Sequence, residues 1–305
     1  MQASNRMLSV RAVLFSFVLA SCTQSPFQGE SIDQNVISKT SGFPGTFNPA
    51  AGVFRISVPR GDLGVSVNGI KITPGLGLTA SAAFTGTRQR TLVVGEVPLL
   101  EDEVNGFLNR VIDSGIQVTA LHNALLWDQP RVLSLHFEGM GNEESLASAV
   151  GALFAKITGN QLEHERPRAL RVDASQGALN PQIIHQFLWK GEFIDGAYRI
   201  STGRGTQLAG LPVGKSMGVD SWASFAGNDE NAIVNGDIAL LEIEMSKVLK
   251  ALINAHLSIV SIHTHLTQEV PRVMFVHFWG AGRLEDLVKG VKSALKTEKN
   301  FRGST

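Results

Sequence analysis

The sequence predicts an α+β protein made of two tandem copies of one domain, each copy an antiparallel sheet with two helices on one face. The first observation is a fixed shift of 141 residues, which places His122 on His263 and His136 on His277 without a gap. The second is the order of patterns inside each copy, which reads strands, helix, hairpin and helix. Because both copies share this order, we expect a duplication with pseudo-twofold symmetry.

The two copies are expected at residues 46–158 and 180–300, joined by a linker at 159–179. Near the start of each copy the shift becomes 144 residues, since "FRISVPRG" (54–61) corresponds to "YRISTGRG" (198–205). The first copy therefore has three more residues between these blocks, a difference typical of a loop. A period this long is far above that of a solenoid repeat and indicates duplication of a whole domain.

Each element of a copy has its own sequence signal. The strands are rich in β-branched residues and alternate between apolar and polar positions. The first helix has acids in its first turn, apolar residues at helical spacing and Gly115 at its end. The elements predicted in the first copy are strands at 54–60 and 91–100, a helix at 101–115, a hairpin from 116–126 and 131–139, and a helix at 143–157. Their equivalents in the second copy include a helix at 241–256, a hairpin from 258–266 and 272–280, and a helix at 283–297.

The N-terminal residues resemble a bacterial export signal. "VLFSFVLA" (13–20) is a short apolar run behind sparse basic residues, too short to remain as a membrane-spanning helix. It ends in "LASC" (19–22), which resembles a lipobox, so we expect a lipoprotein signal peptide at 1–21 and lipidation of Cys22. The polar residues 22–45 are expected to be a flexible tether. The expected partner is a membrane, and the expected location is the bacterial cell envelope, facing the periplasm or the exterior.

The composition excludes several kinds of function. Cys22 is the single cysteine, so a chain lipidated there has no disulfide, no cysteine nucleophile and no cysteine-ligated zinc. The 27 basic and 27 acidic side chains balance, so no nucleic-acid partner is expected. The hydrophobic fraction of 43% with 18% charged residues is typical of a folded globular protein.

The stretch "HTHLTQEVPRVMFVH" sets three of the chain's eight histidines into one predicted hairpin. With the turn centred on Val270, His263 lies opposite His277 and shares its face with His265. Three imidazoles on two neighbouring strands could bind one divalent ion (Zn, Cu, Ni or Mn), with Glu269 at the turn as an oxygen ligand. The sequence therefore predicts a metal site formed by these three histidines and this glutamate.

The stretch "HNALLWDQPRVLSLH" of the first copy has the same length but fewer donors. Ala124 and Asp128 stand where the second copy has a histidine and a glutamate. We interpret this copy as a degenerate site that retains His122, His136 and Asp128. The alternative for both copies is a pair of structural histidines, each hydrogen-bonded to the backbone or to a carboxylate.

Other charged residues receive structural interpretations. Arg131 and Arg272 each follow a proline at the start of the returning strand, and they either pair with acids at the helix starts or bind an anion. Glu96 and Asp237 each follow a glycine and are interpreted as turn residues. The acids at the helix starts are Glu101, Glu103, Glu242 and Glu244.

A "GD" or "GE" turn, an acidic helix start, "IQVTALHN", "PRV…H" and "HFWG" together resemble the LppY/LpqO family of bacterial lipoproteins. The resemblance covers both copies, and the lipobox agrees with it. The hairpin of that family begins H-N-H, whereas the first copy has H-N-A and the second has H-T-H. The resemblance implies a lipid-anchored, duplicated domain and supplies no mechanism.

Two classes of function follow from these patterns. The first is a lipid-anchored envelope protein whose second repeat binds a divalent metal, either to carry the ion or to use it as a Lewis acid in hydrolysis or oxidation. The second is a non-catalytic ligand-binding or adhesion module with structural histidines. The two are separated by whether His263, His265 and His277 converge at a site open to solvent.

Overall fold

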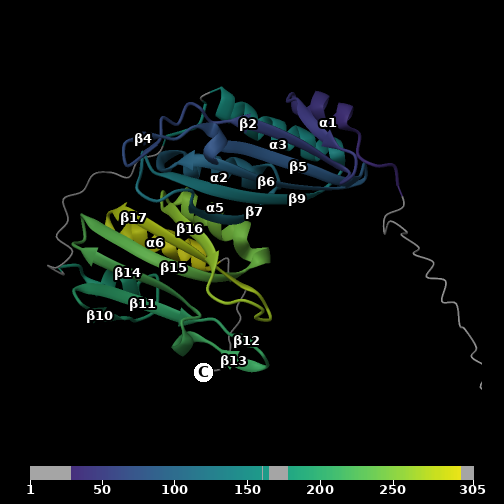
Figure 1. Ribbon diagram of the computed structural model, residues 1–305. Coiled ribbons are helices and arrows are strands. Elements are labelled where there is room, and N and C mark those ends of the chain that lie inside the picture. The colour runs from purple at the N-terminus through teal and green to yellow at the C-terminus, as the bar shows by residue number, and fades with distance from the viewer. Residues whose placement is uncertain (1–28, 160, 165–177, 297–305) are drawn as a thin grey trace, which may run out of the picture.

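The computed structural model describes residues 29–159, 161–164 and 178–296. The predicted signal peptide (1–21) and Cys22 lie outside the described residues, as does most of the predicted linker. Within the described part, the first repeat forms the upper half of the molecule in Figure 1 and the second repeat the lower half. No helix in that part is both long enough and apolar enough to cross a membrane.

The two repeats contribute six strands each to one twelve-stranded antiparallel sheet, and the strand order of the second repeat mirrors that of the first. From the outer edge to the centre, the first repeat supplies β1 (Gly45–Asn48), β2 (Val53–Pro59), β5 (Thr79–Thr87), β6 (Arg90–Leu100), β9 (Val132–Gly141) and β7 (Gln117–Asn123). From the centre outward, the second supplies β16 (Ser258–Thr264), β17 (Val273–Gly282), β15 (Ala232–Leu241), β14 (Asp220–Gly227), β11 (Ala197–Gly203) and β10 (Glu192–Ile194).

The pseudo-twofold axis lies between β7 and β16, the two central strands. These strands pair antiparallel through Leu121 and Ile262. The 141-residue shift places Leu121 on Ile262, so each of these residues pairs with its own counterpart in the other repeat. A pair of this kind marks the symmetry axis. The repeats are therefore joined edge to edge, and the predicted pseudo-twofold arrangement takes the form of one continuous sheet.

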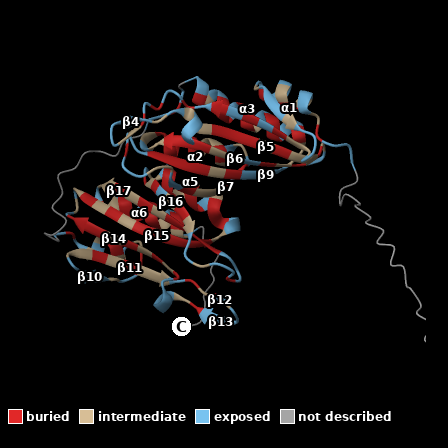
Figure 2. Cartoon of the chain, viewed as in Figure 1, coloured by how far each residue is buried: buried red, intermediate tan, exposed pale blue. Residues whose placement is uncertain are grey.

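Helices cover one face of this sheet, as predicted. Their apolar side chains share one buried core with alternate residues of the strands, and Figure 2 shows this core running through both repeats. A single asparagine also ties the repeats together, because the amide of Asn105 bonds both the Leu257 carbonyl and the Ile259 N–H. The helices are α1 (Gln34–Ser41), α2 (Val104–Asp113), α3 (Glu143–Thr158), α4 (Pro181–His185), α5 (Met245–Asn254) and α6 (Leu284–Lys296), with 3₁₀ turns η2 (Glu101–Glu103) and η4 (Glu242–Glu244) leading into α2 and α5.

Helix α1 lies within the segment predicted to be a flexible tether, and this prediction is wrong for the described part of 22–45. Asp33 caps the helix by accepting from the N–H groups of Asn35 and Val36, and Ile37 is fully buried. The helix packs on α3 at Gly151, where a Cβ would lie 2.3 Å from the Ser41 carbonyl oxygen. Helix α1 has only eight residues, and its few apolar positions are too few to show a helical period within a polar stretch.

Small apolar clusters cover part of the opposite face of the sheet. Phe275 and Ala239, which alternate with residues of the main core, pack there under Val213 and Val219. An equivalent cluster lies in the first repeat. The segments that carry these covers are β3 (Ser66–Val67), β4 (Ile70–Lys71), η1 (Pro74–Leu76) and β8 (Asp128–Gln129) in the first repeat, and β12 (Thr206–Leu208), β13 (Leu211–Val213) and η3 (Lys215–Met217) in the second.

Each repeat contains a buried arginine–glutamate pair that the sequence analysis did not predict. Arg60 reaches Glu103 at 2.9 Å, and both side chains are at most 3% exposed. Arg204 reaches Glu244 at 2.7 Å in the second repeat. Each glutamate also accepts from the backbone N–H three residues earlier, which fixes the entry into the following helix.

The arginines expected to pair with these acids lie elsewhere. Arg131 makes a loose contact of 3.6 Å with Glu101, and both side chains are more than half exposed. Arg272 is exposed and forms no ion pair with any residue in the described part of the chain. Of the pairings expected with the helix acids, the described part of the chain contains only the contact of Arg131 with Glu101.

Candidate metal centre

The histidine hairpin of the second repeat has a different register from the predicted one. His263 pairs with Phe275, and His277 pairs with Ser261. The hairpin is therefore centred on Glu269 and not on Val270. A bulge between Ile259 and Ser261 shifts the ladder again toward the start of β16. The prediction that His263 lies opposite His277 is wrong, although both side chains emerge on the face opposite the main core.

Three potential metal ligands converge beside this hairpin: Asp237, His263 and His265. Their ligand atoms all lie within 4.8 Å of one another. Nε2 of His263 is 3.1 Å from Nε2 of His265, which in turn is 3.6 Å from Oδ2 of Asp237. The two predicted histidines are thus brought together, with an aspartate as the third member.

Packing explains how these residues meet from separate strands. Asp237 lies on β15 and pairs with His277 of β17, so one strand separates it from β16. His265 follows the last paired residue of β16 and folds back over Phe275, with parallel rings 3.4 Å apart at their centroids. Phe275 is 1% exposed and belongs to the small apolar cluster. Stacking on Phe275 of β17 places the imidazole of His265 beside Asp237 of β15.

Backbone and hydroxyl groups orient the two imidazoles. Nδ1 of His265 lies 3.4 Å from the Gly218 carbonyl oxygen, which can only accept a hydrogen bond. In the neutral ring the proton is therefore on Nδ1, and Nε2 offers its lone pair to the cluster. Nδ1 of His263 lies 3.2 Å from the Ser261 hydroxyl. Histidines that bind metals commonly have such a partner on the other ring nitrogen.

The electrostatics of the site favour uncharged groups in the absence of a cation. Burial, and secondly the nearby carboxylate of Asp220, raise the pKa of Asp237 to about 7. Burial, followed by the neighbouring His265 and His277, lowers the pKa of His263. Asp237 is 4% exposed, and its Oδ1 has no hydrogen-bond partner within the described part of the chain. A buried carboxylate without a full set of donors is unusual, and it is a group that a cation would satisfy.

The remaining predicted ligands of the second repeat have other partners. Nε2 of His277 donates to Oδ1 of Asn235 at 2.9 Å, which keeps this nitrogen away from the cluster. Glu269 is 3% exposed, and its Oε1 accepts from the Val273 N–H across the turn. Glu269 is therefore a hairpin residue, and the carboxylate that lies beside the two histidines is that of Asp237.

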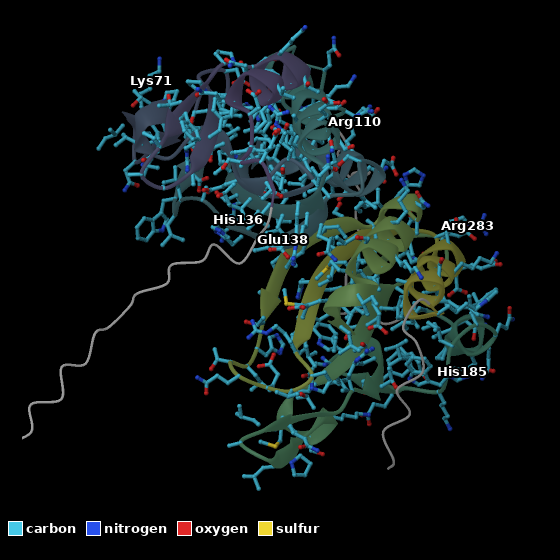
Figure 3. The ribbon with its side chains drawn as sticks, turned by 90° about the vertical axis from the view of Figure 1, so that its right-hand side faces the viewer. Lys71, Arg110, His136, Glu138, His185 and Arg283 are labelled. Atoms are coloured by element: carbon cyan, nitrogen blue, oxygen red, sulfur yellow. The ribbon has the colours of Figure 1, made fainter. Side chains whose placement is uncertain are left out.

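The first repeat brings His122 and His136 together, with their Nε2 atoms 2.9 Å apart. Glu96 lies 3.9 Å from His136, at the position equivalent to Asp237. Figure 3 shows His136 on the side of the first repeat that faces the second. Asp128, predicted as a donor, instead accepts from the Val132 N–H at 2.6 Å in the turn and is not part of this group.

Sequence reasoning missed both carboxylates of these groups. Glu96 and Asp237 were expected in turns, yet they lie in the middle of β6 and β15. The glycine before each of them belongs to the strand and lies under an aromatic ring, where a Cβ would collide with Phe137 or Phe278. Both copies have a carboxylate at this position, and that shared position was the sequence signal for a site residue. In the folded sheet each carboxylate lies two strands away from the histidine strand.

The comparisons with known proteins agree with the duplication. The sequence profile of a family described as Domain of Unknown Function (DUF1259) matches residues 35–156 and 182–297. No curated protein and no solved structure matches the chain. The two matched segments coincide with the two repeats of the sheet and together span most of the sequence. The chain therefore belongs to the family described as Domain of Unknown Function (DUF1259), of which it contains two copies.

Proposed function

We propose that the second repeat binds a divalent transition-metal ion through Asp237, His263 and His265. The convergence of these three ligand atoms within 4.8 Å carries the proposal. The separations fit a single ion: bonds of about 2.05 Å from a tetrahedral zinc place two ligand atoms about 3.3 Å apart. The observed 3.1 and 3.6 Å lie on either side of that value.

Two imidazoles and one carboxylate form a donor set used by zinc and by other borderline divalent ions. We propose that the bound ion is Zn²⁺, Cu²⁺, Ni²⁺ or Mn²⁺, and the titration described below ranks their affinities. Three protein ligands leave at least one coordination position for water or substrate, which is the arrangement of catalytic rather than structural sites. A bound ion would polarise a carbonyl or phosphoryl oxygen, or lower the pKa of bound water. Asp220 lies near enough to Asp237 to raise its pKa.

Titration of metal-free protein with the four ions by calorimetry tests the proposal. We expect one site tighter than about 10 μM, and a loss of affinity of at least about 100-fold in His263→Ala or His265→Ala, because each removes one of three ligands. Glu269→Gln is the matched control: it retains the oxygen that accepts from Val273 and should leave the affinity unchanged. Affinity weaker than tens of micromolar for all four ions, or an isotherm insensitive to His265→Ala, would disprove the site.

We also propose that the protein is a lipoprotein of the bacterial envelope, related to the LppY/LpqO family. The lipobox "LASC" and the N-terminal apolar run support this proposal. Cells that express the chain with a radiolabelled fatty acid should yield labelled protein in the membrane fraction. Cys22→Ser should remove the label and release the folded domains from that fraction. A label that persists in Cys22→Ser would contradict lipidation at this residue.

A cavity at the junction of the repeats favours the second candidate, a non-catalytic ligand-binding module. Its volume is about 790 Å³, which suits a small organic molecule. Leu100 and Arg131 line it from the first repeat, and Val260 and Trp279 from the second. The metal titration separates the two candidates, because a binding module with structural histidines predicts no tight site and no effect of His265→Ala.

A further inference from the structure

We propose that the first repeat carries a second divalent-metal site, formed by Glu96, His122 and His136, that binds more weakly than the site in the second repeat. The two imidazoles stack with their ring centroids 5.0 Å apart and bring their Nε2 atoms to 2.9 Å. Oε1 of Glu96 lies 3.9 Å from Nε2 of His136. Two imidazoles and one carboxylate again form a donor set for zinc, copper or nickel.

A backbone contact sets the protonation of His122. Its Nδ1 lies 2.9 Å from the Asn123 carbonyl oxygen, which only accepts hydrogen bonds. The neutral ring therefore has its proton on Nδ1 and its lone pair on Nε2, directed at His136. The same arrangement orients His265 through the Gly218 carbonyl in the second repeat. Both repeats thus present at least one Nε2 lone pair to a second imidazole.

Two differences between the copies explain why the repeats use different histidine pairs. The first is Ala124, which stands at the position of His265. The second concerns the partner of His277. In the second repeat, Asn235 accepts from Nε2 of His277 and holds this ring away from His263. The 141-residue shift places Val94 at the position of Asn235, and its apolar side chain offers no acceptor. His136, the counterpart of His277, turns to His122 instead. The duplicated scaffold therefore forms a two-histidine, one-carboxylate group twice.

Exposure makes the first-repeat site the weaker of the two. The histidines are similarly exposed, His136 at 35% and His265 at 37%, but the carboxylate side chain of Glu96 is 41% exposed and that of Asp237 only 6%. Water competes more effectively for exposed donors, and the carboxylate of Glu96 must rotate to approach His122. We therefore expect a site that fills after the second-repeat site and releases its metal more readily.

The proposal is tested with Cu²⁺ in the double variant His263→Ala/His265→Ala, which lacks both imidazoles of the other group. This protein should still bind one Cu²⁺, with two nitrogen ligands in its electron paramagnetic resonance spectrum. Adding His122→Ala should weaken binding at least about 100-fold. Adding Val94→Asn should weaken it about tenfold, because the new amide would hold His136 as Asn235 holds His277.

His164→Ala is the control, since His164 is a half-exposed histidine that contacts Asp102 and has no second imidazole beside it in the described part of the chain. The His164→Ala change should leave the binding isotherm and the spectrum unchanged. Circular dichroism of each variant should show that it is folded. The proposal is overturned if the double variant binds no Cu²⁺ below about 100 μM, or binds it equally well after His122→Ala. The comparison of wild type with the double variant tests the second-repeat site, and the double variant alone tests the first-repeat site. Each proposed site can therefore be disproved independently of the other.

Discussion

Replacing Arg60 by methionine should lower the free energy of unfolding by about 3–5 kcal/mol, because it leaves the carboxylate of Glu103 buried without its cation. The two side chains are 1% and 3% exposed and 2.9 Å apart. Arg60 also donates to the Pro98 carbonyl, so the change removes a second buried hydrogen bond. Methionine fills a similar volume, and the loss therefore reflects charge and hydrogen bonding more than a cavity. Urea denaturation at neutral pH measures the effect.

Two further variants separate the buried charge from other effects of this change. Arg60→Met combined with Glu103→Gln should recover part of the loss, because glutamine is neutral and still accepts from the Leu100 N–H. Arg131→Met is the matched control at an exposed pair and should change stability by less than about 1 kcal/mol. A small effect of Arg60→Met, comparable to that of Arg131→Met, would contradict the assignment of a buried structural pair.

The same pair shows why the fold could be predicted from the sequence but some long-range contacts could not. Duplication, strand alternation and helical spacing are local or repeated signals, and they predicted the two α+β copies and their order. Glu103 was correctly singled out as an acid at a helix start. Its partner, however, is Arg60, which follows β2 and is separated from β6 by the strand β5, and not Arg131. No local pattern distinguishes a buried from an exposed arginine.

The candidate site was predicted in part for similar reasons. His263 and His265 share a face in any extended strand, so alternation predicted their proximity. The oxygen ligand was expected at Glu269, because this residue is near in sequence. Asp237 instead reaches the site through the order of strands in the sheet, with β17 between it and the histidines. That order depends on tertiary packing, as does the stacking of His265 on Phe275.

Asp237→Asn should abolish metal binding in the second repeat while stabilising the metal-free protein. The carboxylate is buried, and its pKa is raised to about 7 from 3.8, so ionising it opposes folding. The neutral amide avoids this cost and can donate to Nε2 of His265. At pH 8 we expect the variant to be more stable than the metal-free wild type by roughly 4–5 kcal/mol, at about 1.4 kcal/mol for each unit of the pKa shift of Asp237.

The pH dependence of this difference follows from the direction of the shift. Between pH 3.8 and about 7 the folded wild type keeps the proton of Asp237, whereas the unfolded chain has lost it. The folded state therefore binds more protons, and the stability of the wild type falls as the pH rises through this window. Asp237→Asn has no such group, so the difference in unfolding free energy should grow from pH 4 to pH 7 and then level off. Thermal or urea unfolding of both proteins with a chelator present measures it.

Added metal should narrow this difference, because an ion that binds only the folded wild type stabilises it by about 2.7 kcal/mol at 100 times the dissociation constant. The variant should gain nothing from the second-repeat site. A purely structural role for Asp237 makes the opposite prediction: the substitution would destabilise the protein with or without metal. A buried carboxylate that destabilises the metal-free protein, and is stabilising only with a cation bound, has a role in binding and not in folding. Measuring the unfolding free energy of both proteins with and without metal distinguishes these two roles.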